Sequence, residues 1–412
     1  MQLVAYGAQD IYLTGNPQIT FFKVVYRRHT NFAMEAVEQT LNGSVAFGNK
    51  VTATVSRNGD LVGRMYLEVN ISGLTINDDI GPNLGSALVN EAVCEIGGQQ
   101  IDKHYGHWLE VYAELTEPND SGHVGVMIND GTLISGTKFQ NMSRMGGVEG
   151  VTSNGTALDP FWVPLQFWFN RNPGLALPLI ALQYHEVKVS VTFNPEAYMI
   201  TADSTVQTGA GSTLDVKLWA DYIYLDTDER RRFAQVSHEY LIEQVQFQTF
   251  SGTPTSMDLT FNHPVKELIW TGVEAVTALG NGDNVDMDAK GRSTPTTVAG
   301  TNATYTLKLN GHERMAARDH KYFTRTQVWQ HHTGFGGMVP DNNASNCNDS
   351  IAVYSFALKP EEHQPSGTCN FSRIDNAQLV VGGTGVAAYN VYAVNYNVLR
   401  VMSGMGGLAY SN

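Results

Sequence analysis

The chain has 412 residues, a formal net charge of −14 and only three cysteines. A strongly acidic chain is a poor general binder of nucleic acid because phosphates repel it, and three scattered cysteines do not build a disulfide framework, so folding in a reducing cytosol is expected. The length exceeds what one hydrophobic core usually supports, and 40 glycines with 10% aromatic residues favour an all-β fold of at least two domains.

The first 30 residues stand apart from the rest of the chain. Over residues 1–34, Lys23, Arg27 and Arg28 outweigh Asp10, so this stretch is basic within an acidic protein. The basic run is either a solvated turn or an arm that docks on an acidic partner or a membrane face.

Four landmarks of residues 36–225 recur in the same order in residues 240–401. They are two strands around a tight turn, a glycine-interrupted strand before a helix-like stretch, two strands around a Pro/Gly loop, and a closing strand. The landmarks begin at Val51, Val93, Val163 and Trp219, and their later copies begin at Met257, Tyr305, Val353 and Tyr392. The spacing between copies drifts, as loops of unequal length would produce, so we predict two like domains rather than a short-period solenoid.

Alternating apolar and polar residues predict half-exposed antiparallel strands, most clearly over residues 214–224. Helical signals are sparse. Asp102 is a typical helix-capping residue and begins a helix-like stretch, while Asp226–Arg232 places acids before bases, as the helix dipole favours. The predicted division is an arm at residues 1–30, a first domain at 31–227, a link at 228–238, and a second domain with a C-terminal tail at 239–412.

No motif for catalysis or cofactor binding is complete. The patterns of zinc proteases, calcium loops, dinucleotide-binding folds and hydrolase nucleophiles all lack required residues. His104 and His107 could share a helix face with Glu110 or Glu114 and hold a metal ion, but Gly106 lies between them and a further ligand is unassigned. Ordinary packed or surface histidines are therefore favoured, and neither an enzyme nor a cofactor is predicted.

Two other classes of protein share a duplicated β architecture. A double-cupin enzyme would need two histidines and a carboxylate around a metal, and the chain has no His-x-His pair. A tandem β-sandwich that binds glycans is harder to exclude, because Trp162, Trp168 and Trp329 are potential stacking platforms. Their strand context favours packing in the core instead.

Long motifs extend along almost the whole chain. They occupy Gly7–Lys23, Tyr26–Arg28, Asn31–Ala33, Ser56–Leu61, Glu95–Gln99, Pro173–Val187, Tyr354–Pro360, Gln364–Asn376 and Asn395–Tyr410. Together they resemble the major capsid proteins of large icosahedral nucleocytoplasmic double-stranded DNA viruses, most nearly those of the chlorella-virus (phycodnavirus) type. The stretches 117–159, 198–212, 275–301 and 333–350 have no match in that pattern.

The resemblance implies a double jelly roll, that is, two tandem eight-stranded antiparallel β-sandwiches with short helices and an N-terminal arm. It implies a structural protein of the virion, synthesised and assembled in the host cytoplasm. Its homotrimers would form pseudo-hexagonal capsomers that contact neighbouring capsomers, minor capsid proteins and the internal membrane side of an icosahedral shell, without direct nucleic-acid binding.

From the residues themselves, the expected arm contacts are Lys23, Tyr26, Arg27 and Arg28. Residues 404–408 read either as an irregular tail that packs on a neighbouring roll, with contacts at Met405, Leu408 and Tyr410, or as a frayed terminus. Asn302, Asn343 and Asn348 begin three of nine Asn-x-Ser/Thr triplets and are the candidate glycosylation sites.

Overall fold

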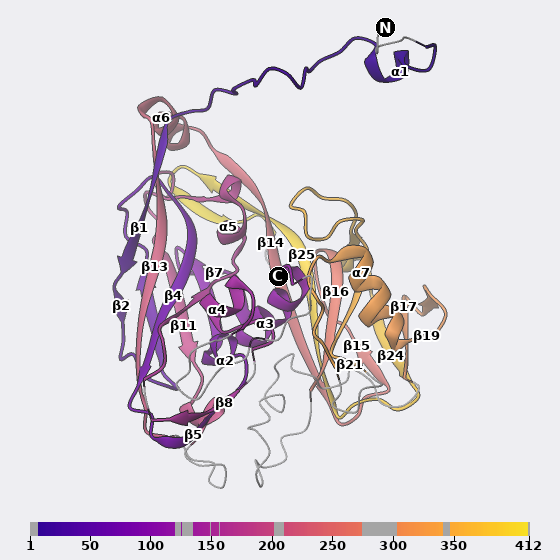
Figure 1. Ribbon diagram of the computed structural model, residues 1–412. Helices are drawn as coiled ribbons and strands as arrows, with labels where there is room; N and C mark the ends of the chain where they lie inside the picture. The colour runs from indigo at the N-terminus through magenta and orange to yellow at the C-terminus, as the bar shows by residue number, and fades with distance from the viewer. Residues whose placement is uncertain are drawn as a thin grey trace, which may run out of the picture.

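The computed structural model shows two β-sandwiches standing side by side, with the N-terminal arm extending away from them (Figure 1). The structure describes residues 7–119, 125, 135–148, 150–155, 157–201, 210–273, 303–340 and 347–410. Among these residues, no helix has the length and apolar character needed to cross a membrane. We call the sandwiches roll 1 and roll 2 in chain order.

In its described residues, roll 1 contains thirteen strands and several short helices. Its strands are β1 (Phe32–Gln39), β2 (Leu41–Asn42), β3 (Lys50–Thr54), β4 (Leu61–Ser72), β5 (Ile76–Ile80), β6 (Val89–Ile96), β7 (Gln99–Tyr105), β8 (Val151–Asn154), β9 (Phe161–Pro164), β10 (Leu177–Pro178), β11 (Val187–Phe193), β12 (Ile200–Thr201) and β13 (Thr213–Leu225). Its helices are α2 (Leu84–Leu88), α3 (Gly106–Thr116), α4 (Lys138–Ser143), α5 (Trp168–Arg171), η1 (Pro173–Leu175) and η2 (Glu196–Tyr198). Sheet 1a has the order β1-β13-β4-β10 with β9 also beside β4, sheet 1b has the order β2-β3-β11-β6-β7, and β12-β5-β8 form a small third sheet.

Roll 2 repeats this plan. Its strands are β14 (His238–Ser251), β15 (Ser256–Asp258), β16 (Pro264–Val273), β17 (Thr304–Leu309), β18 (His312–Glu313), β19 (Arg318–Asp319), β20 (Met338–Pro340), β21 (Cys347–Asp349), β22 (Ile351–Ser355), β23 (Cys369–Asn370), β24 (Ala377–Gly382), β25 (Ala388–Met402) and β26 (Met405–Leu408). Its helical segments are the π-helical turn η4 (Tyr322–Thr326), α7 (Gln327–His331) and η5 (Phe371–Arg373). Sheet 2a has the order β14-β25-β16-β22 with β23 and β26 at its margins, sheet 2b has the order β15-β24-β17-β18 with β19 beside β17, and β20 pairs with β21.

The strand orders of the two rolls match position by position. In sheets 1a and 2a, β1-β13-β4 corresponds to β14-β25-β16, and in sheets 1b and 2b, β3-β11-β6-β7 corresponds to β15-β24-β17-β18. Strands β3 and β4 are neighbours in sequence but lie in opposite sheets, and so do β15 and β16, which is how a jelly roll closes over one core. The predicted all-β class, the duplication and the double jelly roll are confirmed.

The helix start predicted at Asp102 is wrong. Asp102 continues strand β7, where it pairs with Cys94 of β6, and helix α3 begins only at Gly106. A Cβ atom on Gly106 would lie 2.0 Å from the carbonyl oxygen of Val89 and 2.2 Å from that of Ser86. Because it has no side chain, Gly106 permits this close backbone contact at the first turn of α3.

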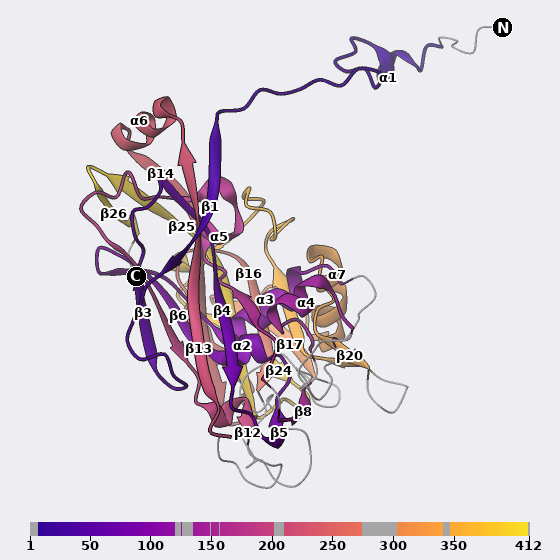
Figure 2. The ribbon, with the colours of Figure 1, turned by 60° about the vertical axis from the view of Figure 1, so that its left-hand side comes forward.

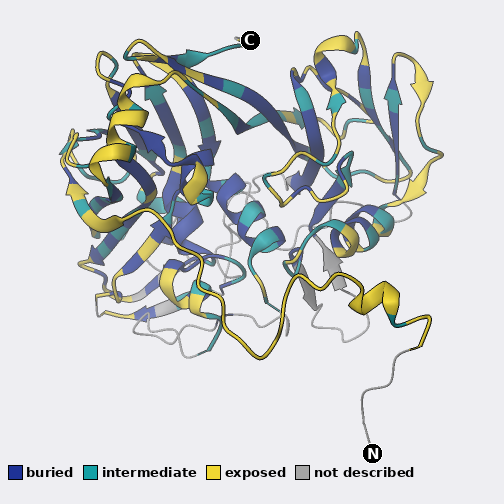
Figure 3. Cartoon of the chain, turned by 90° about the horizontal axis from the view of Figure 1, so that it is seen from above, coloured by how far each residue is buried: buried dark blue, intermediate teal, exposed yellow. Residues whose placement is uncertain are grey.

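Each roll encloses its own hydrophobic core. Strand β13 alternates buried and more exposed residues along most of its length, as its sequence pattern predicts. Trp168 and Tyr222 are almost fully buried in roll 1, and Trp270 and Tyr305 in roll 2. Seen from above, the strands of both rolls are largely buried, whereas the arm is exposed along its described length (Figure 3).

Helix α6 (Thr227–Gln235) joins the two rolls at the end of the molecule from which the arm departs (Figure 2). The Asp226 carboxylate accepts a hydrogen bond of 2.7 Å from the Thr227 amide at its N-terminus. Acidic residues occupy the first turn and Arg232 the last, as predicted from the dipole. The arm itself contains α1 (Ile11–Thr14) and an otherwise extended chain that leads into β1.

Candidate assembly surfaces

An apolar seam joins the two rolls. Trp108, Val111 and Leu115 are spaced three and four residues apart and so lie along one side of α3. They pack on the outer face of sheet 2a, and the rings of Trp108 and Tyr392 lie 5.1 Å apart between centroids. The five sheet residues of the seam are each at most 2% exposed and are Ile269, Ile351, Val353, Tyr392 and Val394. The other side of α3 packs into the roll 1 core, so this helix belongs to both rolls.

Buried ions continue the seam from roll 1 to roll 2. Glu243 on β14 accepts a hydrogen bond of 3.0 Å from Arg171 on α5 and is 3.0 Å from the Lys266 ammonium on β16. The Lys266 ammonium also donates to the Pro360 carbonyl at 2.6 Å. One carboxylate therefore holds two cations from different rolls. Removing it would take the nearest carboxylate from both buried cations, and breaking a buried ion pair costs about 3–5 kcal/mol in comparable cases.

A second group of ions lies beside the first. The imidazole of His332 is 2.9 Å from Glu267 through Nε2 and 3.1 Å from Glu361 through Nδ1. Burial opposes protonation of His332, but the two carboxylates outweigh it and raise its pKa to about 9. Burial also opposes ionisation of Glu267, yet His332 and Lys266 hold the pKa of that carboxyl below its usual value. At neutral pH the two groups together contain three cations and three carboxylates, so the buried charge is balanced.

The arm is apolar as well as basic. Every residue from Ile11 to Asn31 is exposed, and Phe21, Phe22 and Tyr26 expose 89%, 98% and 87% of their surface. All four predicted arm contacts, Lys23, Tyr26, Arg27 and Arg28, lie on this extended stretch. Because large apolar side chains exposed to water mark interaction surfaces, the arm is a candidate binding surface.

The prediction of an irregular C-terminal tail is wrong. Met405–Leu408 forms strand β26, which pairs with β25 through a tight turn in which Ser403 and Gly404 both have positive φ. The tail lies on roll 1 of its own chain, where His185 Nδ1 is 2.9 Å from the Gly406 carbonyl oxygen. Of the predicted contact residues, Leu408 packs against the roll 1 core, whereas Met405 and Tyr410 are 52% and 62% exposed.

The candidate metal ligands are separated by the fold. His104 lies on β7 in the roll 1 core, 4.3 Å from the Phe167 ring, and burial lowers its pKa to about 3. His107 lies on α3, and its Nδ1 is 2.5 Å from the Tyr392 hydroxyl. Glu110 Oε1 instead accepts hydrogen bonds from the backbone of a neighbouring loop, and burial raises the Glu114 pKa to about 8. In the described part of the chain, no three His, Cys, Asp or Glu side chains are grouped to hold a metal ion.

The three tryptophans proposed as core residues have different surroundings. Trp168 is buried as predicted, but the core packing predicted for Trp162 and Trp329 is wrong, since they are 37% and 81% exposed. Trp162 lines an open groove of about 710 Å³ on the outer face of sheet 1a, together with Tyr66 and Met142. Trp329 lies on α7, whose neighbouring residue Val328 packs in the seam.

The candidate glycosylation sites fall mostly beyond the described structure. Asn302 and Asn343 lie outside the described residues. Asn348 lies in β21, where its backbone pairs with Val339 of β20. Glycosylation at these positions stays a prediction.

Sequence reasoning missed the buried ions of the seam. Arg171, Glu243 and His332 come from segments more than seventy residues apart and follow no short motif. The one local signal is the charged pair Lys266-Glu267 inside the otherwise apolar strand β16. A charged pair in a buried strand requires partners of opposite charge, but the sequence does not show where those partners are.

Two jelly rolls of one strand order, fused through a buried seam, define a double jelly-roll protein with an exposed N-terminal arm. Comparison with protein families agrees for both halves: residues 20–226 match the model described as major capsid protein N-terminus, and residues 229–407 match that of the large eukaryotic DNA virus major capsid protein. The chain belongs to this family of major capsid proteins.

Full-length relatives support the same assignment. The chain is 51% identical to the major capsid protein of Pyramimonas orientalis virus and 42% identical to that of Paramecium bursaria Chlorella virus 1, with 100% of this chain and 99% of each relative covered. The crystal structure of PBCV-1 VP54 superposes with a TM-score of 0.75 at 38% identity, covering 95% of this chain and 100% of that one. The predicted family and the function of major capsid protein are confirmed, and the glycan-binding alternative has no support among these relatives.

Proposed function

We propose that three copies of the chain form a homotrimeric, pseudo-hexagonal capsomer that tiles an icosahedral shell. The observation that carries this proposal is the matching strand order of two rolls packed side by side in one chain. A three-fold axis then arranges six similar units in a ring, and each capsomer presents six similar sides to its neighbours. The buried seam supports this function because it fixes the angle between rolls before assembly.

We propose that the arm contacts minor capsid proteins or neighbouring capsomers on the membrane side of the shell. Lys23, Arg27 and Arg28 make it locally basic, while the chain as a whole carries a charge of −14. Its exposed apolar side chains give such a contact a hydrophobic component. In this proposal, residues 1–30 form the arm, 31–227 roll 1, 228–238 the link, and 239–412 roll 2 with the C-terminal hairpin on roll 1.

We further propose that the chain is structural rather than catalytic and that it is synthesised in the host cytoplasm before incorporation into the virion. The relatives are named as capsid proteins, which supports a structural role. The acidic composition supports a shell protein without direct contact to the packaged nucleic acid.

Light scattering of the purified full-length chain tests the trimer. The expected mass is about three times 45.1 kDa, and negative-stain images should show particles of near-hexagonal outline. A chain that stays monomeric at every concentration tested would overturn the capsomer proposal.

A further inference from the structure

The outer faces of the two corresponding sheets differ in whether they are covered. In roll 2, helix α3 of roll 1 covers the outer face of sheet 2a and buries it. In roll 1, the outer face of sheet 1a carries the open groove beside Trp162, which residues of α3, α4 and α5 border without closing it. The two sheets have the same strand order, so the same position is filled in one roll and open in the other.

Strand register identifies the matching residues. Met65 pairs with Ala220 in sheet 1a, and Leu268 pairs with Ala393 in sheet 2a. One residue further along β4 and β16, Tyr66 is flanked by Trp219 and Pro164, while Ile269 is flanked by Tyr392 and Val353. The seam residues Ile269, Ile351, Val353, Tyr392 and Val394 therefore correspond to Tyr66, Trp162, Pro164, Trp219 and Asp221.

The five seam residues of roll 2 and their five counterparts in roll 1 differ in how far they are buried. All five seam residues of roll 2 are at most 2% exposed, whereas none of their five counterparts in roll 1 is buried. Four of the counterparts line the groove of about 710 Å³. Three of the five are aromatic, which suits a surface that another helix covers, because rings bury much area at little entropic cost.

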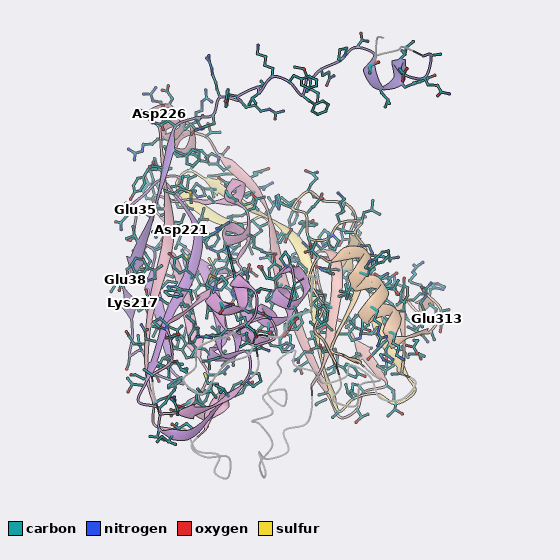
Figure 4. The ribbon with its side chains drawn as sticks, in the orientation of Figure 1. Glu35, Glu38, Lys217, Asp221, Asp226 and Glu313 are labelled. Atoms are coloured by element: carbon teal, nitrogen blue, oxygen red, sulfur yellow. The ribbon has the colours of Figure 1, made fainter. Side chains whose placement is uncertain are left out.

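The segment that corresponds to α3 in roll 2 is η4 with α7. It follows the β17–β18 hairpin as α3 follows β6–β7. Where α3 buries Trp108 in the seam, α7 leaves Trp329 81% exposed. Glu38, Lys217 and Asp221 mark the sheet 1a side in Figure 4, whereas α7 lies on roll 2 in Figure 1, where its Val328 packs in the seam.

The α7 segment is basic, whereas the groove carries charges of both signs. Residues 313–332, which contain η4 and α7, include four basic residues, Arg314, Arg318, Lys321 and Arg325, against two acidic ones. The groove in sheet 1a is lined by Glu117 and Asp221 and by Arg64 and Arg171, and Glu68 and Lys217 pair beside it, so its charges balance. Glu117 and Asp221 are the groove residues that would attract the basic residues next to α7.

We propose that α7 of one copy, with Trp329 at the centre, docks in the sheet 1a groove of a second copy and repeats between chains the contact that α3 makes within the chain. This inference rests on the proposed trimer. The contact is head-to-tail, and such contacts produce a ring when the rotation closes. Three copies would then contain three seams within chains and three helix contacts between chains in alternation.

Trp329→Glu in the full-length chain is the first test. Trp329 is mostly exposed, so the variant should fold, and the trimer dissociation constant should rise by about tenfold or more because a central tryptophan commonly dominates an interface. Tyr12→Glu is the matched control: it places the same charge on a 91% exposed ring of the arm, and the trimer should persist. A wild-type trimer that Trp329→Glu leaves unchanged would overturn the groove contact and leave the capsomer proposal standing.

Cross-linking supplies a second test that does not depend on loss of assembly. Two singly substituted chains, Trp162→Cys and Trp329→Cys, are co-expressed with different tags in a background lacking the native cysteines. Mild oxidation should produce a disulfide-linked dimer containing both tags, and neither variant alone should do so. A mixed trimer without that cross-link, or a cross-link found only within one chain when both cysteines are combined, would contradict docking between copies.

Discussion

The charge on His332 should make the stability of the protein fall as the pH rises above neutrality. The pKa of His332 is raised to about 9, against about 6.5 for an unperturbed histidine, because Glu267 and Glu361 outweigh the cost of burial. A raised pKa means that the folded state holds the proton more tightly than the unfolded state. The stabilisation is therefore complete below about pH 6.5 and is lost as the pH rises through about 9.

The size of this contribution to stability follows from the difference in the pKa of His332 between the folded and the unfolded chain. Each pKa unit corresponds to 1.36 kcal/mol, so a shift of about 2.5 units contributes about 3 kcal/mol when the histidine is fully protonated. The His332 side chain is 2% exposed and that of Glu267 is 6% exposed, so solvent screens this pair weakly. Gln is a suitable replacement because it keeps a hydrogen-bond donor and removes the titration.

The assay is the apparent free energy of unfolding in urea, followed by tryptophan fluorescence at intervals between pH 6 and 9.5 for wild type and His332→Gln. Asp102 and Glu114, whose pKa values burial raises to about 7 and about 8, also change stability with pH, but they titrate in both proteins and largely cancel in the difference. The difference should be about 3 kcal/mol near pH 6 and should shrink toward pH 9.5. An equal difference at every pH would refute the reasoning, and His312→Gln at an exposed position is the control.

Four further predictions address the seam, the α3 turn, the arm and the groove. Trp108→Ala should destabilise the protein by about 3–5 kcal/mol and separate the unfolding of the two rolls into two urea transitions, because the ring is buried between them. Gly106→Ala should cost more than about 2 kcal/mol in thermal or urea unfolding, since its Cβ would meet two carbonyl oxygens, whereas Gly98→Ala, with open space around it, should cost about 1 kcal/mol. Deletion of residues 1–28 should leave trimers intact by light scattering but impair shell incorporation, and loss of the trimer would contradict it. Raising the salt concentration from about 0.05 to 0.5 M should weaken the trimer measured by sedimentation, because charges at the groove are screened there.

Local patterns in the sequence predicted the features that depend on local physics. Alternation along residues 214–224 predicts β13, and acids before bases predict α6, since each depends on neighbours in the chain. Asp102 was misassigned because a capping residue also fits a strand once β6 supplies a partner. Trp162 and Trp329 were misassigned because apolar character does not reveal which face of an element is covered. Their positions depend on packing between segments far apart in sequence.

The ordered tail and the buried ions show the same limit. Ser403 and Gly404 are typical of a tight hairpin turn, so strand β26 had a local signal, but its docking on roll 1 depends on His185, more than two hundred residues away. The ion cluster had only Lys266-Glu267 as a hint. Family motifs recovered the architecture because they record long-range packing that one sequence does not display.

The different composition of the two corresponding faces has a physical explanation in the proposed assembly. Helix α3 covers the face of sheet 2a as soon as the chain folds. Ile269, Val353 and Val394 are therefore not exposed to water in the folded chain. The face of sheet 1a would stay in water until a second copy arrives. Its counterparts to those residues are Tyr66, Pro164 and Asp221, which combine contact area with polar groups that water can solvate. A fully apolar face at this position would associate with other apolar surfaces before α7 of the second copy docked in the correct position. The polar groups therefore make the contact between chains weaker than the seam and dependent on salt, which is the property that the sedimentation experiment measures.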